Sequence, residues 1–289
     1  MLDEQIPQAL KLTLFRILVR PTMPLYPLEI PREEIIKTAA TAPLSLKTRK
    51  NSTWKIGNVR IEEQYIYLRI GRIRLDHQSI LDSTGDFVDT ENEVAPYSHV
   101  FINTAIGICS ISRNVDLSYL TESISIVLTK LLNESLNRRD IAAEIELEPI
   151  KDPIEFIIKL QSAHLVTKLW VTVKRPNPLD VNRDFTLPTS RVLEELNGDE
   201  STTGWSGNAL NVRQPGVVDI INSAATTGGN ARATIKKNSN SPLLPITMTS
   251  NLARLGTFSR ESIRNIFNEI SESYNQIRTR GRNNDSGPE

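Results

Sequence analysis

The pattern of apolar and polar residues divides the first half of the chain into strands and helices. Alternating or continuous apolar runs predict strands over residues 10–20, 53–61, 64–75, 98–112, 141–150 and 165–175. Apolar residues at three- and four-residue steps predict a long helix that starts at Asp116 as N-cap and runs to Asn137. Shorter helices are expected over 32–40 and 153–163. This order has no regular strand–helix alternation, so it predicts an α+β fold with a mixed or antiparallel sheet.

The second half of the chain has a different composition. Gly, Ser, Thr and Asn are frequent beyond Asn177, around short helical patterns over 190–196 and 216–225. A strand over 231–238 reads as polar on both faces, which favours pairing with another chain, and an amphipathic helix follows over 259–278. We therefore predict a core domain over 1–178 with a basic hairpin, a dimerisation region over 179–280 and a disordered tail over 281–289.

The stretch "QYIYLRIGRIRL", residues 64–75, interleaves tyrosines and arginines with apolar residues. Strict alternation places Tyr65, Tyr67 and Arg69 on one face of a strand, and the apolar phase then changes after Gly71. A β-bulge at this glycine would bring Arg72 and Arg74 onto the same face as the tyrosines. The predicted result is one aromatic and cationic strip on the hairpin.

Charge along the chain is zoned. The totals balance at 34 basic and 34 acidic residues, but eight basic residues and only two acids fall between Lys47 and Arg74. Residues 82–93 contain five acids and no basic residue, within a segment to Pro96 that we expect to be a loop. The last sixty residues again lean positive. Zoned charge suits a protein that binds an anion on one surface and a basic partner on another.

Basic side chains with interleaved rings supply both parts of a nucleic-acid surface, namely phosphate-neutralising charge and flat aromatic faces. Arginine adds a forked set of donors that matches phosphate. No recognition helix stands out, so we expect contacts to the DNA backbone with little sequence preference. The predicted DNA-binding residues are Lys47, Arg49, Lys50, Lys55, Arg60, Tyr65, Tyr67, Arg69, Arg72 and Arg74.

Catalytic motifs are few. "TTGGNAR", residues 226–232, lacks the lysine and spacing of a P-loop and is interpreted as a turn. The three histidines are isolated, and the single cysteine, Cys109, has apolar neighbours typical of an inert core thiol. We expect no cofactor, no metal site and no catalytic residues. The enzymatic alternative is a metal-dependent nuclease or nucleotide-processing enzyme that uses the acids of 82–93.

Three successive segments carry a resemblance to a known family. They are "YSHVFINTAIGICSISRNVDLSYLTESISIVLTKLLN", "IELEPIKDPIEFIIKL" and "LVTKLWVTVKRPNP". This order resembles the RexA-like phage-exclusion proteins and related sensor subunits of antiphage defence systems, over about Tyr97 to Pro178 and a C-terminal helix. The resemblance implies a homodimer that binds DNA without marked sequence preference and works with a membrane effector encoded nearby. No site motif of that family carries over to individual residues of this chain.

Three functional hypotheses follow from these observations. The leading one is a non-enzymatic, sequence-nonspecific DNA-binding sensor subunit of an antiphage defence system. The others are the metal-dependent enzyme and a subunit that contacts only protein. The longest apolar runs are far shorter than the roughly 20 residues of a membrane span, and the N-terminus lacks a secretory pattern. We therefore expect a cytoplasmic protein.

Overall fold

The structure is a computed structural model. It describes residues 2, 4, 6, 9–23, 28, 30–41, 45–47, 52–81, 83–174, 192–193, 195–196, 198–248, 252–258 and 261–279, without the side chains of residues 77, 78, 80, 90, 257 and 279. Arg49, Lys50, the predicted boundary at residue 178 and the predicted tail over 281–289 lie outside these residues.

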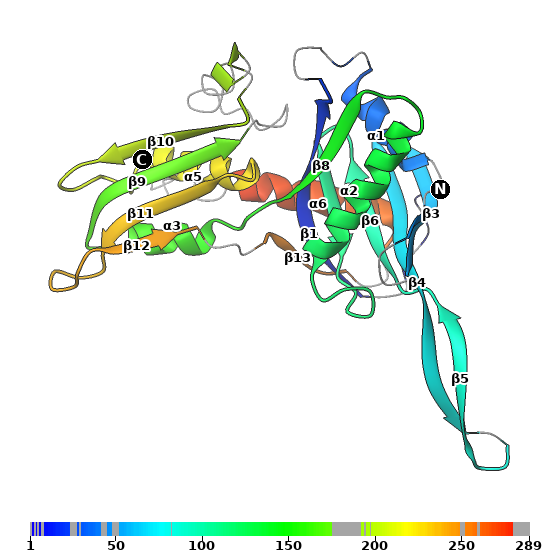
Figure 1. The fold of residues 1–289 in the computed structure, drawn as a ribbon. Helices are drawn as coiled ribbons and strands as arrows, with labels where there is room; N and C mark the ends of the chain where they lie inside the picture. The colour runs from blue at the N-terminus through cyan, green and yellow to red at the C-terminus, as the bar shows by residue number, and fades with distance from the viewer. Residues whose placement is uncertain are drawn as a thin grey trace.

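A nine-stranded sheet forms the larger part of the molecule (Figure 1). Its main path has the order β13-β1-β7-β6-β4-β3-β2, while β5 pairs with β4 and β8 pairs with β1. All of these pairs are antiparallel. The strands are β1 (Leu10–Pro21), β2 (Ser45–Lys47), β3 (Thr53–Glu62), β4 (Tyr65–Leu81), β5 (Phe87–Val94), β6 (Tyr97–Asn103), β7 (Ile108–Ser112), β8 (Ala143–Pro149) and β13 (Arg254–Phe258).

Helices cover both faces of this sheet. The α1 helix (Arg32–Thr41) and the α2 helix (Thr121–Asn137) bury their apolar sides with Phe15, Leu68 and other residues on one face. The α6 helix (Ile263–Thr279) covers the other face, where Phe267 and Tyr274 belong to a second core cluster. Burial on both faces explains why β1, β6 and β7 read as continuous apolar runs in the sequence.

A smaller antiparallel sheet has the strand order β10-β9-β11-β12. It consists of β9 (Leu165–Lys174), β10 (Glu200–Ser206), β11 (Asn230–Lys236) and β12 (Leu244–Thr247). One face packs with α3 (Ile154–Gln161) and α5 (Pro215–Thr226) around a third core cluster. Two mostly antiparallel sheets with helices packed on them confirm the predicted α+β fold.

The two sheets do not divide the chain at a single point. The β9 strand already belongs to the smaller sheet, and α6 returns to the larger one. The prediction of a two-sided polar strand over 231–238 was wrong, because β11 lies between β9 and β12 and buries Ala231, Ala233 and Ile235. The apolar side of α6 is likewise covered within the same chain.

A buried ionic network joins the two sheets. Arg16 of β1 lies opposite Glu148 of β8 and forms an ion pair with it at 3.0 Å, while Lys174 of β9 reaches the other carboxylate oxygen at 2.5 Å. Arg16 also donates to the backbone carbonyl of Thr227, at 2.6 Å. Thr227 lies in the "TTGG" segment, where Gly228 adopts a φ of +71° directly against Glu148. The segment is thus a turn, as predicted, and it packs on this network.

The acidic segment after β4 is a strand and not the predicted loop. The β5 strand pairs with the second half of β4, from Arg74 opposite Val94 to Leu81 opposite Phe87. This hairpin projects away from the rest of the molecule (Figure 1). We call it the arm, residues 74–94. No helix in the described part of the chain is long and apolar enough to span a membrane.

Candidate anion-binding site

The predicted strip depends on the register of β4, and the predicted bulge at Gly71 was wrong. Pairing of β4 with β6 runs without a shift from Tyr65 to Gly71, and pairing with β3 is regular through Gly71 as well. The shift lies in β3 between Gly57 and Arg60, where Asn58 has a φ of +53°. Gly71 instead allows close approach of β6, because a Cβ there would lie 3.3 Å from the Cβ of Tyr97.

An uninterrupted β4 divides the predicted residues between the two faces of the sheet. Tyr65, Tyr67 and Arg69 share the face covered by α6, together with Arg60, which lies opposite Tyr67. Lys47 and Lys55 are exposed and, by register, belong to this face. Arg72 and Arg74 belong to the opposite face, where α1 and α2 pack. The described residues of the predicted strip therefore form two separate groups.

The tyrosines are internal residues. Tyr65 packs its ring 4.7 Å from that of Phe267 in α6. Tyr67 is 1% exposed, and its hydroxyl accepts a hydrogen bond from Arg69 Nε at 2.9 Å and lies 2.8 Å from His99 Nδ1. Burial and the positive charge of Arg69 lower the pKa of His99 to about 4, which keeps the ring neutral at physiological pH. These rings stabilise the sheet and are not presented to a ligand.

Arginines on the α6 face have carboxylate partners. Arg60 forms an ion pair with Glu4, and the guanidinium of Arg60 lowers the pKa of that carboxyl. Arg69 lies 4.0 Å from the same carboxylate and over the ring of Tyr97. Arg264 of α6 pairs with Glu62. Much of the positive charge on this face is therefore neutralised within the molecule.

Arg72 and Arg74 line an open pocket of about 550 Å³ on the opposite face. Arg72 lies over the buried ring of Trp54, at 5.7 Å from the ring centroid. The Nε atoms of both arginines are buried and have no hydrogen-bond acceptor among the described residues. A buried donor without a partner is costly, so a shift of either side chain that brings its guanidinium to an anion in the pocket would gain the missing hydrogen bonds.

The rest of the pocket is formed by the segment that precedes α2, which the sequence had assigned to the helix itself. The helix starts at Thr121 and not after Asp116, because the Asn114 side chain accepts a hydrogen bond from the Asp116 N–H, and Asn114 and Ser118 form a bridge. The remaining lining residues are Val115, Asp116, Leu117, Ser118, Tyr119, Leu120 and Ser123.

Two features at this end of the pocket bear on its ligand, because a helix N-terminus favours an anion and an exposed ring can stack on a base. The N-terminus of α2 lies at the pocket, and its partial positive charge attracts negative groups. Tyr119 is 78% exposed and gives the pocket an accessible aromatic face. Asp116 offsets one of the two arginine charges. Tyr119 was not among the predicted site residues, because the sequence pattern placed it inside the helix that starts at Asp116.

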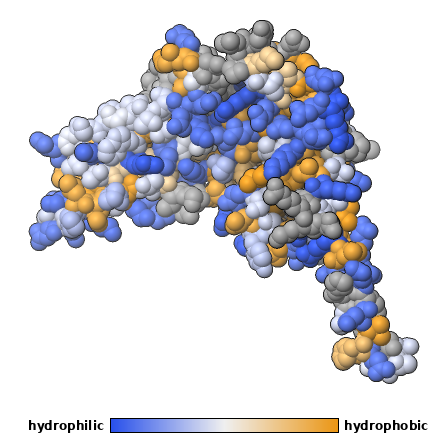
Figure 2. Space-filling model, viewed as in Figure 1, coloured by the Kyte–Doolittle hydropathy of each residue, from blue (hydrophilic) through white to orange (hydrophobic). Residues whose placement is uncertain are grey.

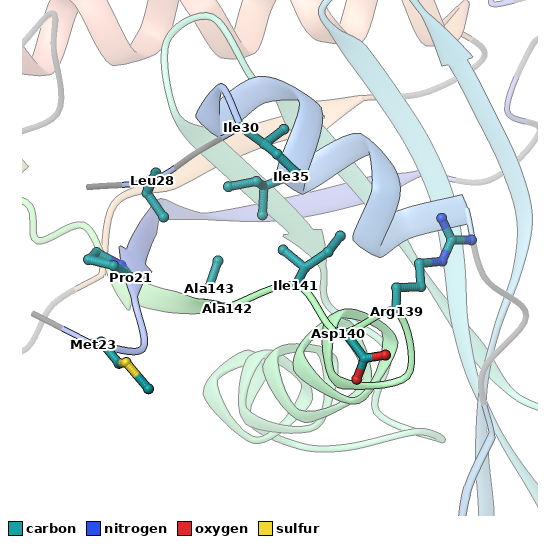
Figure 3. A pocket seen from close by; sticks show the side chains of 10 residues that line it. All are labelled: Pro21, Met23, Leu28, Ile30, Ile35, Arg139, Asp140, Ile141, Ala142 and Ala143. Atoms are coloured by element: carbon teal, nitrogen blue, oxygen red, sulfur yellow. The ribbon is translucent and has the colours of Figure 1, made fainter. Parts of the chain in front are cut away.

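A second pocket of about 550 Å³ lies between α1, the end of β1 and the α2–β8 connection. Figure 3 shows the aliphatic side chains of Leu28, Ile30, Ile35 and Ile141 gathered together, with Arg139 and Asp140 to one side. This lining offers hydrocarbon surface with few polar groups, so it gives no catalytic or phosphate-binding geometry.

The acids proposed for the enzymatic alternative lie on or beside the arm. Asp89, Glu91 and Glu93 are at alternate positions of β5, and Asp86 precedes it. Among the residues that the structure describes, no group of three or more His, Cys, Asp and Glu side chains is arranged to hold a metal ion. Cys109 is fully buried, and burial raises the pKa of its thiol.

Comparison of the chain with protein-family models gave no match, and no curated protein sequence matches it either.

Proposed function

We propose that this protein is a non-enzymatic DNA-binding subunit that contacts phosphate through the pocket of Arg72 and Arg74. The observation that carries this proposal is the pair of arginines that line one open pocket, each with a buried Nε atom that has no hydrogen-bond partner among the described residues. A planar guanidinium donates two parallel hydrogen bonds to a phosphate, which a point charge cannot do. The pocket contains no base-reading helix, which agrees with binding of the backbone without sequence preference.

The exposed ring of Tyr119 extends this proposal to the form of the nucleic acid. A flat ring beside a phosphate site can stack on an unpaired base, and stacking tolerates every sequence. Lys47 and Lys55, both exposed, supply further charge along the β2–β3 side of the sheet. These residues lie on the α6 face and not beside the pocket, so they would add only to the long-range attraction of a polyanion to the molecule.

The biological role follows from the resemblance to the RexA-like proteins. On that basis we propose a cytoplasmic homodimer that senses phage DNA or protein–DNA complexes and acts through a membrane effector encoded beside it. Phage plating on cells with this gene and its neighbour, compared with cells that carry Arg72→Gln and Arg74→Gln, tests the role. Equal protection by the wild type and the variant would contradict it.

The direct test measures retention of DNA at several salt concentrations. We expect the double variant Arg72→Gln/Arg74→Gln to bind more weakly and to reduce the slope of log K against log salt by about one unit for each phosphate that it no longer neutralises. The matched control is Arg60→Gln/Arg264→Gln, which removes two arginines of the α6 face that already have carboxylate partners. This control should bind nearly as well as the wild type.

Two results would replace this proposal with one of the alternatives. Absence of retention at low salt would favour a subunit that contacts only protein. Cleavage of plasmid in the presence of magnesium or manganese, abolished by Asp86→Ala and Asp89→Ala, would favour the enzyme. Equally weakened binding in the control variant would assign the phosphate contacts to the α6 face instead.

A further inference from the structure

The arm exposes an apolar surface that nothing in the described chain covers. Leu75, Leu81 and Phe87 are 62%, 62% and 82% exposed, and Figure 2 shows apolar atoms recurring along the projection. The β5 strand pairs with β4 and with no other strand in the described part of the chain. An isolated two-stranded hairpin is only marginally stable in water, so a free arm of this kind is suited to docking.

The two faces of the arm differ in charge. Because β4 and β5 pair without a shift, Leu75, Leu81 and Phe87 share one face with Asp89, Glu91 and Glu93. These three carboxylates stand at alternate positions, so the first and last are about 14 Å apart along the strand. Among the described residues, the opposite face carries one acid, Asp76. A partner for the face with Asp89, Glu91 and Glu93 needs positive charges spaced over the same length as these carboxylates, with apolar surface beside them.

The face of the smaller sheet that no described helix or strand covers provides such a surface. Its outward residues on the central strands include Lys168 and Trp170 of β9 and Arg232 and Lys236 of β11. Arg232 lies opposite Trp170. Lys168 lies opposite Thr234, which is midway between Arg232 and Lys236 on β11. Three cations therefore follow one another over about 14 Å, the same length as the three carboxylates. An acid, Glu200, stands at the far end of β10.

We propose that the acidic face of the arm docks on the smaller sheet of a second copy of this chain. The arm and the smaller sheet project from opposite sides of the larger sheet, so an arm does not reach the smaller sheet of its own chain (Figure 1). A twofold axis would make the exchange reciprocal, because each copy gives one arm and receives one. Asp89, Glu91 and Glu93 then face the three cations, and Phe87 extends towards Trp170.

This inference gives a contact surface to the homodimer of the proposed function, and it does not depend on DNA binding. Light scattering of the protein without DNA measures it directly. We expect a dimer at about 50 mM salt that dissociates at about 500 mM, where exposed charges are screened. A monomer at low salt and at all accessible concentrations would overturn the proposal, whatever the result for DNA.

Charge reversal on either surface identifies the contact. The arm variant Glu91→Lys/Glu93→Lys and the sheet variant Lys168→Glu/Lys236→Glu should each weaken self-association at least about tenfold, because like charges face one another. Mixed in equal amounts, the two variants should form a heterodimer, since both reciprocal contacts become complementary again. The control Asp76→Lys, on the opposite face of the arm, should leave the dimer intact.

Two outcomes of the mixing experiment contradict the proposal. Variants that keep their circular dichroism spectrum but remain monomeric when mixed would show that these surfaces do not meet. A sheet variant that stays dimeric but loses DNA retention would assign the uncovered sheet face to nucleic acid.

Discussion

Replacement of Arg16 by methionine removes the central cation of the network between the two sheets. Arg16 is fully buried, and it contacts both Glu148 of the larger sheet and the Thr227 carbonyl beside the smaller one. Methionine fills similar volume without charge. The substitution leaves the Glu148 carboxylate, itself 5% exposed, with Lys174 as its remaining cation in the network.

Loss of one partner from a buried ion pair costs about 3–5 kcal/mol of unfolding free energy. The same strand offers a matched control, because Arg20 lies four residues further along β1 and pairs with Glu146 of β8 at 3.4 Å and with Asp199 at 3.0 Å. These pairs are partly exposed, with 30% of the Arg20 side chain and 45% and 71% of the two acidic side chains accessible. Arg20→Met should therefore cost only about 0–1 kcal/mol.

Urea unfolding at neutral pH, followed by fluorescence and by far-ultraviolet circular dichroism, measures both variants. A difference of less than about 1 kcal/mol between Arg16→Met and Arg20→Met would refute the buried-network reasoning. A third variant, Arg16→Met/Glu148→Met, should recover part of the loss, because it removes the buried carboxylate that Arg16→Met leaves with Lys174 alone.

Three further predictions concern single residues. The pKa of His99 is lowered to about 4 in the folded protein, so as pH falls the unfolded chain protonates this histidine before the folded one does. The free energy of unfolding should therefore fall by up to about 3 kcal/mol between pH 6.5 and 4, as measured by urea unfolding. The variant His99→Phe should reduce this pH-dependent loss. Gly229→Ala should lower the free energy of unfolding by at least about 2 kcal/mol, because its Cβ would lie 1.9 Å from the Thr172 carbonyl oxygen. The control Gly216→Ala, whose Cβ would meet no atom within 4 Å, should be neutral or stabilising in the same thermal unfolding experiment. Cys109 should resist thiol reagents in the folded protein and react fully in urea, and rapid labelling of the native protein would contradict its placement.

Much of the fold could be predicted because apolar periodicity reports burial. The strands over 10–20 and 53–61 and the helix over 259–278 correspond closely to β1, β3 and α6. The arm could not be predicted in this way, since a strand that packs on nothing has no reason to alternate apolar and polar residues. Its sequence from Asp82 to Glu93 has the composition of a loop, and only pairing with β4 makes Phe87–Glu93 a strand.

The site was only partly predictable, and the reason is a matter of register. Arg72 and Arg74 were among the predicted residues, but the prediction grouped them with Arg69 by placing a β-bulge at Gly71. The structure keeps β4 regular at Gly71 and has the register shift in β3, beside Gly57. Only the close approach of β6 to Gly71 distinguishes these two glycines, and a contact between distant segments leaves no periodic signal.

The unbroken β4 strand brings the two proposed surfaces into one element. Its 17 residues start under α6 with Tyr65, pass the pocket at Arg72 and Arg74, and continue into the arm. Arg74 belongs to both parts, since it lines the pocket and forms the first pair of the arm with Val94. A partner that holds the arm therefore fixes the backbone that carries one of the two arginines. If docking of the arm changes the affinity of the pocket for an anion, thermodynamic linkage requires that an anion in the pocket changes the affinity of the arm for its partner by the same factor.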